Sequence, residues 1–216
     1  MPRLVTFGCS FAFGQDLADC RHPWHNPSKF AWPNLLAEKL GRECLNLSRM
    51  GRGNMHILMH VLQTEFHKDD LVIMAYSFFD RYRYYRFTDF DKGEYMNIPM
   101  PSPERDDIVK ADTYNPYIDQ EYHWYNYLTM HHIELYLNSK NIENYSFLNT
   151  NVEYHNNRDC PELIKLKNFW PDIHCVLNTG HNYKDMDFAL DGRHPGPESH
   201  KLQAQLIYNK LRAQNV

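Results

Sequence analysis

The feature that most constrains the fold is the apolar segment 70–76, which reads Asp-Leu-Val-Ile-Met-Ala-Tyr. An apolar run without alternating polar residues predicts a strand covered on both faces, as in a parallel sheet between two layers of helices. Strand-like and helix-like segments alternate before it. Together they predict a β-α-β-α-β order, which is typical of a doubly wound parallel sheet.

Four segments build this order ahead of the apolar strand. Short apolar runs that end in turn residues predict strands, whereas apolar residues three and four apart predict helices. In the first helix Leu36 and Leu40 share a face, and Gly41 suits the C-terminal cap. The predicted elements are strands at 4–8 and 44–48 and helices at 32–41 and 55–67.

The second half of the chain resumes the pattern after an irregular segment. The predicted elements are a helix at 121–138, a strand at 144–149, a short helix around 162–167 and a closing helix at 197–213. Segment 78–120 is rich in aromatic residues, arginine and proline, and is longer than an ordinary loop. We interpret it as an insertion over one end of the sheet.

Length and charge narrow the class of protein. A chain of 216 residues suits one well-cored domain, to which we assign residues 1–216. The net charge of −4 gives no sign of a nucleic-acid or membrane-binding surface. No apolar run approaches the ~18 residues that a membrane helix needs. We therefore expect no nucleic-acid partner and no membrane partner.

The cysteines indicate the compartment. Their number is odd and no pair has CxxC spacing, which argues against both a disulfide framework and a zinc ribbon. The first residues lead straight into a strand, without the pattern of a secretory signal. We expect a cytoplasmic protein with reduced thiols, no cofactor and no metal.

Ser10 stands where the first strand ends, in the segment Gly8-Cys9-Ser10-Phe11. A side chain at this point is held by the sheet and faces the region where open α/β sheets bind their ligands. An ordinary strand followed by a turn of small residues, without a catalytic role, would give the same sequence pattern. Ser10 is therefore a candidate nucleophile that needs a base from elsewhere in the chain.

The segment Asp191-Gly192-Arg193-His194-Pro195 offers that base just ahead of the closing helix. The imidazole of His194 can accept a proton near neutral pH. Asp191, three residues earlier, can reach the other ring nitrogen and hold the tautomer. A turn capped by Asp191 beside a solvated histidine is the structural alternative.

Other residues suit nucleophilic or metal chemistry less well. Cys9 adjoins Ser10, but neighbouring side chains of a strand point to opposite faces. His56 and His60 have a spacing that can hold a metal, but no acidic or cysteine ligand accompanies them, which favours paired histidines on a helix surface. Weaker candidates still are His131 with His132, and His22 with His25.

These blocks, in this order, resemble the SGNH or GDSL-like hydrolase superfamily. Phe7-Gly8-Cys9-Ser10 is similar to its Gly-Asp-Ser block, with Cys9 where aspartate is usual. The segment 46–54 is similar to its second block, and 191–195 to its final Asp-x-x-His block. One subset of the family, familiar from bacteria and their viruses, looks similar to this chain. Its members have Gly-Cys-Ser-Phe in the first block and a Ser-x-x-x-Arg-like third block, which would correspond to Ser77 and Arg81 here.

The resemblance implies a three-layer α/β/α fold with a central parallel, flavodoxin-like sheet, and hydrolysis of esters. It implies that Ser10 is the nucleophile, His194 the base and Asp191 the residue that orients His194. The backbone N–H groups of Ser10 and Gly51 would face the developing oxyanion.

The third block departs from the family pattern. Phe79 stands where the family has an asparagine that completes the oxyanion hole, and losing one such donor costs on the order of 10²–10³ in turnover. Asn54 or Ser77 can supply the donor from a shifted position. Tyr76 and Arg81 are then candidate substrate-binding residues.

Two functions follow from these observations. The first is a Ser-His-Asp hydrolase that removes acyl groups, such as acetyl, from a carbohydrate or another small ester. The second is a catalytically weakened scaffold that binds carbohydrate or serves in phage assembly, in which case the protein would be virion-associated.

Overall fold

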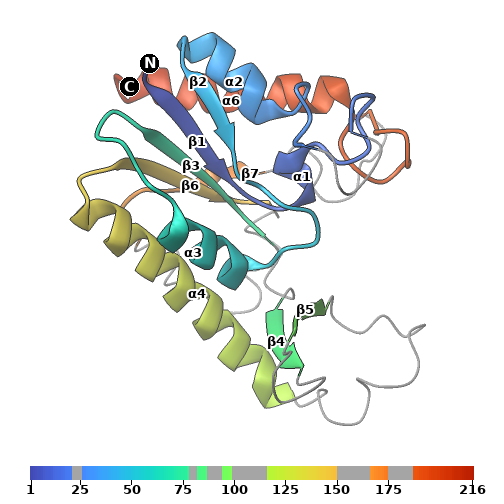
Figure 1. The fold of residues 1–216 in the computed structure, drawn as a ribbon, viewed down its shortest axis with the longest axis vertical. Helices are drawn as coiled ribbons and strands as arrows, with labels where there is room; N and C mark the ends of the chain where they lie inside the picture. The colour runs from blue at the N-terminus through green and yellow to red at the C-terminus, as the bar shows by residue number, and fades with distance from the viewer. Residues whose placement is uncertain (21–25, 78–81, 87–93, 99–115, 150–165, 175–186) are drawn as a thin grey trace.

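A twisted parallel sheet forms the centre of the molecule (Figure 1). The computed structural model describes residues 1–20, 26–77, 82–86, 94–98, 116–149, 166–174 and 187–216. The five strands pair in the order β2-β1-β3-β6-β7, and every pair is parallel. Their bounds are β1 Arg3–Phe7, β2 Glu43–Asn46, β3 Leu71–Tyr76, β6 Glu143–Leu148 and β7 Phe169–His174. The expected flavodoxin-like order is confirmed.

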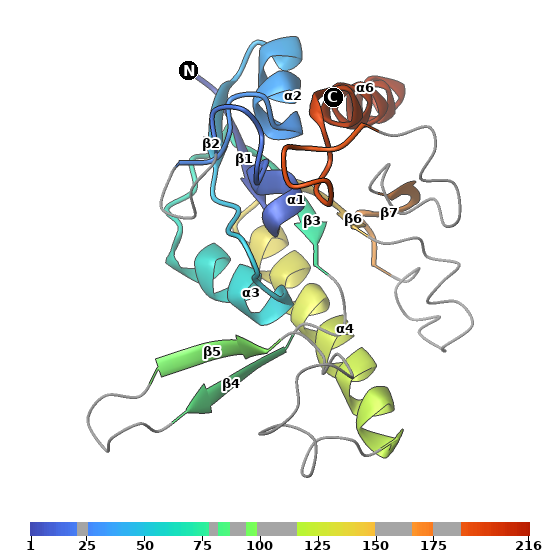
Figure 2. The same cartoon turned by 90° about the vertical axis from the view of Figure 1, so that its right-hand side faces the viewer.

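Helices cover both faces of this sheet, which confirms the predicted three layers. One layer holds α2 (Trp32–Leu40) and α6 (Pro197–Ala213), and the other holds α3 (Asn54–Gln63) and α4 (Pro116–Ser139). Figures 1 and 2 show the two layers on opposite sides of the strands. The predicted helices match these four elements, although α4 begins five residues before the expected 121–138 and α3 ends four residues before the expected 67.

The core follows from the alternation of side chains along each strand. In β3, Val72 and Met74 pack toward α3 and α4, whereas Leu71 and Ile73 pack toward α2 and α6. All six residues of β3 are buried. The fully apolar strand that the sequence indicates is therefore the strand with both faces covered.

Two parts of the fold, β7 and a pair of strands within segment 78–120, were not predicted from the sequence. The strand β7 has no sequence signature because Pro171 interrupts it, and proline is tolerated there since β7 lies at the edge of the sheet. Within the segment 78–120, which we interpret as an insertion, β4 (Tyr82–Arg86) pairs in antiparallel orientation with β5 (Glu94–Ile98). Most of the predicted helix at 162–167 lies outside the described residues.

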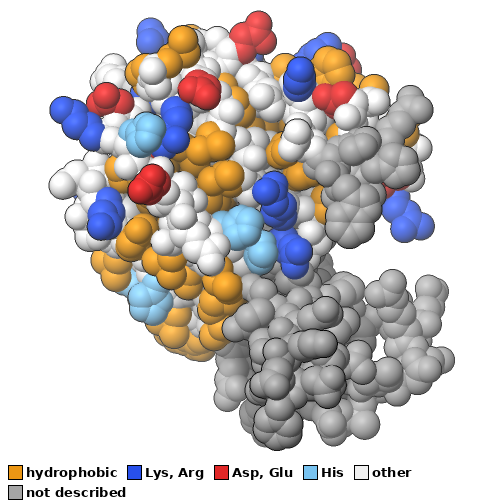
Figure 3. Space-filling view, viewed as in Figure 1, with side chains coloured by type: hydrophobic (Ala, Val, Ile, Leu, Met, Phe, Trp, Pro, Cys, Tyr) orange, Lys and Arg blue, Asp and Glu red, His pale blue; other side chains and the backbone are white. Residues whose placement is uncertain are grey.

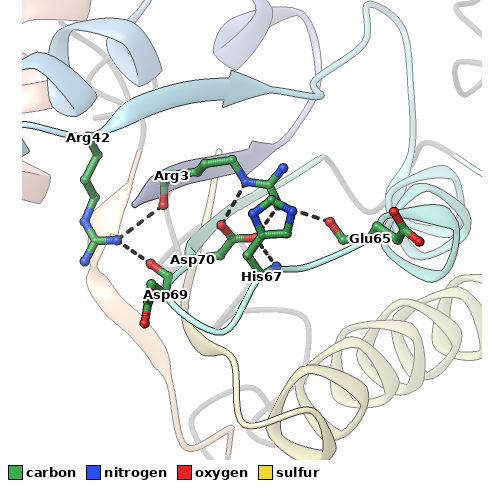
Figure 4. A network of polar contacts seen from close by, with 6 residues as sticks. All are labelled: Arg3, Arg42, Glu65, His67, Asp69 and Asp70. Carbon is green, nitrogen blue, oxygen red and sulfur yellow. Dashed lines mark hydrogen bonds and ion pairs between the residues drawn. The ribbon is translucent and has the colours of Figure 1, made fainter. Parts of the chain in front are cut away.

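A polar network joins β1 and β3 at their amino ends, whereas Ser10 follows the carboxyl end of β1 (Figure 4). The guanidinium of Arg3 in β1 donates to both carboxylate oxygens of Asp70, at 2.9 and 2.6 Å, and to the carbonyl of Glu65. Burial alone would raise the pKa of Asp70, but the hydrogen bonds from Arg3 and from the His67 amide lower it. Asp70 is thus a charged anchor for the start of β3.

The surface carries charges of both signs, and hydrophobic side chains gather over α3 and α4 (Figure 3). Large apolar side chains exposed on the described part of these helices are Leu62, Trp124, Tyr125, Leu128 and Leu135. Among the described helices, none is long and apolar enough to cross a membrane.

Candidate active site

Ser10 is the first residue of α1 (Ser10–Phe13), a single helical turn that begins just past the end of β1. Gly8 allows this tight entry, because a Cβ there would lie 2.8 Å from the Cβ of Ala12 and 3.2 Å from the carbonyl oxygen of Ala75. Gly14 ends the turn in the left-handed conformation, with φ of 76°. The side chain of Ser10 is held at the carboxyl edge of the sheet and is only 2% exposed.

Two asparagines that the sequence did not single out hold this turn in place. Asn46, at the end of β2, donates from Nδ2 to the carbonyl of Ala12 at 2.8 Å. Asn149, directly after β6, donates from Nδ2 to the Cys9 sulfur at 3.3 Å and to the carbonyl of Ala75 at 3.2 Å. The buried Cys9 is therefore part of the support behind Ser10.

The turn 191–195 forms a carboxylate–imidazole pair. Nδ1 of His194 lies 2.6 Å from Oδ2 of Asp191, and Oδ1 of Asp191 accepts the backbone N–H groups of Arg193 and His194, each at 3.0 Å. Burial alone would raise the pKa of Asp191, yet these hydrogen bonds lower it to about 2. Asp191 is therefore ionised at neutral pH and holds the hydrogen on Nδ1, which leaves Nε2 as the proton acceptor.

The fold brings this turn against the segment that contains Ser10. The ring of Phe11, next to Ser10, meets the His194 ring edge-on with a centroid distance of 5.7 Å. The Leu190 amide donates to the Asp16 carbonyl at 3.1 Å, so the loop after α1 is bonded to the loop before α6. Figure 2 shows these two segments side by side. Residues almost the whole chain apart thus share one corner of the molecule.

Ser10 and His194 are not hydrogen-bonded to each other, although the structure describes both residues. The Ser10 side chain is almost fully buried, and that of His194 is 18% exposed. Catalytic hydrogen bonds are often long in unliganded sites and tighten only when substrate binds. The assignment of both residues as catalytic stays a prediction.

The candidate oxyanion donors differ in how available they are. The Ser10 amide lies in the first turn of α1, where a helix leaves N–H groups without an internal acceptor. Gly51 is exposed and has φ of 66° in the turn after β2. Asn54 Nδ2 donates to the carbonyl of Ser77 at 3.2 Å and to Asn126 Oδ1 at 2.8 Å, so both of its amide hydrogens are engaged. This geometry favours Ser10 and Gly51 over Asn54.

Ser77 and Asn54 are bound to each other at two points. The Ser77 amide donates to Asn54 Oδ1 at 2.7 Å, in addition to the bond from Nδ2 to the Ser77 carbonyl. Both residues are buried. Asn54 therefore ties the start of α3 to the residue that follows β3.

Tyr76 is a correction to the sequence-based expectation. Its side chain is 1% exposed and lies in the core beside Met74 and Met130, with which its hydroxyl makes contacts of 3.5 and 3.4 Å. The reason is strand parity, since Tyr76 points to the same face as Val72 and Met74. It is a core residue and not a substrate contact. Phe79 and Arg81 lie outside the described residues.

Asp16 is the residue at the site that sequence reasoning missed. Its Oδ2 lies 3.8 Å from His194 Nδ1, and the ligating atoms of Asp16, Asp191 and His194 all lie within 4.8 Å of one another. This spacing would also fit a metal ion, but acidic groups near the surface commonly lie this close together without one. His56 and His60 pack ring against ring at 4.2 Å, and no third potential ligand joins them among the residues searched. The only signal for Asp16 was its place in a polar turn shortly after Ser10.

Solved structures of similar fold come from esterases and lipolytic proteins. A lipolytic protein of the G-D-S-L family from Desulfitobacterium hafniense aligns with a TM-score of 0.53 at 11% identity, over 97% of this chain and 99% of that one. The acetyl xylan esterase Est2A from the rumen bacterium Butyrivibrio proteoclasticus aligns with a TM-score of 0.59 at 13% identity. A carbohydrate esterase whose active site displays divergent catalytic and non-catalytic binding functions gives 0.59 at 14%.

Coverage and identity limit what these similarities show. The chain spans about two thirds of the two carbohydrate esterases, 64% of Est2A and 65% of the other, while 99% and 98% of this chain are covered. No protein-family model matches the sequence, and no curated protein matches it significantly. At these identities the similarity establishes the fold.

Proposed function

We propose that this chain, which has an SGNH-like hydrolase fold, is a serine hydrolase that cleaves ester bonds. The observation that carries the proposal is the His194–Asp191 pair at 2.6 Å, whose ring contacts Phe11 beside Ser10. A base with its tautomer held by a carboxylate, next to a serine at the carboxyl edge of a sheet, is the arrangement that nucleophilic ester cleavage needs.

The chemistry follows from the roles of these groups. His194 Nε2 takes the proton of Ser10 as the Ser10 Oγ attacks the ester carbonyl, and Asp191 stabilises the imidazolium that forms. The backbone N–H groups of Ser10 and Gly51 donate to the developing oxyanion. The imidazolium then returns its proton to the departing alcohol. Water, activated by the same imidazole, releases the acid and restores the Ser10 hydroxyl.

For the substrate, we propose acyl esters of carbohydrates, with acetyl as the first candidate. Support comes from two of the structural neighbours, one an acetyl xylan esterase and the other a carbohydrate esterase. We retain the cytoplasm as the proposed location, with a small ester or glycan ester as the only proposed partner.

The test combines turnover with covalent labelling. Wild type and Ser10→Ala are compared on p-nitrophenyl acetate, p-nitrophenyl butyrate and acetylated xylan, and both are treated with a serine-reactive fluorophosphonate. We expect the wild type to turn over at least one ester and to be labelled, and Ser10→Ala to lose both properties by 10³-fold or more, as an order of magnitude for loss of a catalytic serine. Equal activity in the two proteins would refute the assignment of Ser10.

A second candidate function is non-catalytic binding of carbohydrate, as a weakened scaffold or an assembly component of a phage. The buried Ser10, not hydrogen-bonded to His194 in the structure that describes both, favours it. One structural neighbour combines catalytic and non-catalytic binding functions in its active site. Glycan-array binding that survives Ser10→Ala, without turnover of any ester and without fluorophosphonate labelling, would support this alternative.

A further inference from the structure

Asp16 is a second carboxylate directed at the imidazole of His194. Its Oδ2 lies 3.8 Å from Nδ1, on the nitrogen that already pairs with Asp191 at 2.6 Å. A neutral imidazole has one hydrogen on Nδ1, and the shorter distance gives that hydrogen to Asp191. Asp16 is too far away to share it and acts on His194 through its charge.

The backbone of Asp16 is fixed on both sides. Its N–H donates to the Cys20 carbonyl at 3.0 Å, and its own carbonyl accepts the Leu190 amide at 3.1 Å. Leu17, the next residue, is buried against Ala31 and Ala189. The loop that contains Asp16 is therefore packed against the turn that contains His194, and the distance between the two charged groups is set by the fold.

The conformation of Asp16 does not explain why the residue is an acid. Its φ of 62° lies in the left-handed region, which asparagine and glycine adopt at least as readily as aspartate. Its carboxylate is 26% exposed and faces His194. What aspartate adds over those residues is a negative charge beside the imidazole.

We infer that Asp16 is a positioning residue that stabilises the His194 imidazolium by charge, while Asp191 holds the Nδ1 hydrogen. The inference rests on the proposed function, because the imidazolium forms when His194 takes the Ser10 proton. With His194 neutral, two negatively charged carboxylates lie beside the same ring nitrogen and repel each other. Proton transfer to Nε2 makes the ring positive, and that charge attracts both carboxylates.

Titratable groups from three parts of the described structure interact with His194. Asp191 comes from its own turn, Asp16 from the loop after α1, and His200 from α6. His200 is buried and its pKa is lowered to about 4, chiefly by that burial, so it is neutral at the pH of an assay. Asp16 and Asp191 are then the two negative charges that lie beside the ring.

The experiment compares wild type with Asp16→Asn and Asp16→Gly, both of which tolerate a positive φ. Glu38→Gln is the matched control, because it removes the same charge from an exposed position of α2. The pH profile of kcat/KM is measured on p-nitrophenyl acetate. In parallel, NMR follows the titration of the His194 imidazole, whose signal is identified by its absence in His194→Gln. Thermal melts check that each variant folds.

We expect both Asp16 variants to lower kcat/KM at its plateau by roughly tenfold, as an order of magnitude for a charge about 4 Å away near the surface. The acid limb of the profile and the NMR midpoint should both move to lower pH, because the ring loses its proton more easily without the second negative charge. Glu38→Gln should match wild type in all three measurements. A role confined to the backbone would move neither the limb nor the midpoint.

The outcomes separate this inference from the proposed function. If wild type is inactive on every ester and is not labelled by fluorophosphonate, the proposed function fails, and the NMR midpoint still decides whether Asp16 acts on His194. If wild type is active but Asp16→Asn and Asp16→Gly keep its acid limb and midpoint, the inference fails and the proposed function stands.

Discussion

His200 is a buried imidazole whose protonation should weaken the fold at mildly acidic pH. The side chain is 1% exposed, and its Nδ1 accepts the backbone N–H of Trp32 at 3.0 Å. Trp32 is the first residue of α2, where the helix itself offers no acceptor for that N–H. A proton on Nδ1 would replace this hydrogen bond with repulsion between two N–H groups. His200 therefore joins α6 to the start of α2 only while it is neutral.

The size of the effect follows from proton linkage. Burial lowers the pKa of His200 from 6.5 to about 4, with Asp187 opposing the change and His194 adding to it. In the unfolded chain His200 binds a proton below about pH 6.5, whereas in the folded chain it does so only below about pH 4. The stability that neutral His200 contributes is therefore fully present above the unfolded pKa of 6.5, and it is lost as the pH falls below that value. Between pH 7 and pH 5 the loss is about 2 kcal/mol of unfolding free energy.

The assay is urea denaturation of wild type and His200→Asn at several pH values between 7 and 5. Asparagine places Oδ1 near the position of Nδ1, so it can accept the Trp32 amide without titrating. Its smaller volume lowers the free energy of unfolding by the same amount at every pH. This loss cancels when the stability of each protein at pH 5 is compared with its own stability at pH 7. We expect wild type to lose about 2 kcal/mol more than His200→Asn over this range.

If both proteins lose the same free energy of unfolding between pH 7 and pH 5, the reasoning is refuted, because groups other than His200 would then bind the protons that destabilise the fold. Asp70, Asp187 and Asp191 also have lowered pKa values, but these carboxyl groups start from 3.8 and titrate below the chosen range. The difference between the two proteins removes the other histidines from the comparison. The pH window thus isolates His200.

Two further predictions concern the support of the sheet and of the Ser10 turn. Gly8→Ala should destabilise the protein by roughly 1–3 kcal/mol in urea denaturation, because its Cβ would meet Ala12 at 2.8 Å, and adding Ala12→Gly should recover part of the loss. If Ala12→Gly recovers none of the lost stability, the strain in Gly8→Ala does not come from the contact with Ala12. Asp70→Asn should cost roughly 3 kcal/mol, because it leaves Arg3 without its carboxylate. Glu65→Gln is the control, since Glu65 contributes only its backbone carbonyl to Arg3, and an equal loss in both variants would contradict the prediction.

Much of the fold can be predicted from local patterns. The helices α2, α3, α4 and α6 and four of the five sheet strands follow from local sequence patterns, whereas the single turn α1 was not predicted as a helix. The fully apolar β3 predicts a parallel sheet with helices on both faces. The strand β7 could not be predicted, because an edge strand tolerates proline and presents no uniform apolar run. The hairpin β4–β5 lies in an aromatic, charged segment whose pattern did not distinguish strand from loop.

At the site, the same division holds for individual residues. Asp191 and His194 are three apart in one turn, so their pairing at 2.6 Å follows from short-range geometry that the sequence contains. Ser10 could be recognised by its place after a strand. Tyr76 was misread because its position at the end of β3 does not reveal that its side chain lies in the core against Met130 of α4.

The tertiary structure alone decides which distant groups meet. Asp16 faces His194 because the loop after α1 packs against the loop before α6, and no spacing in the chain encodes that contact. His200 is neutral because α6 buries it over the start of α2. The local sequence therefore determines the elements and the Asp191–His194 turn. Long-range packing determines the charges and the burial that surround that turn, since these depend on residues brought together from opposite ends of the chain.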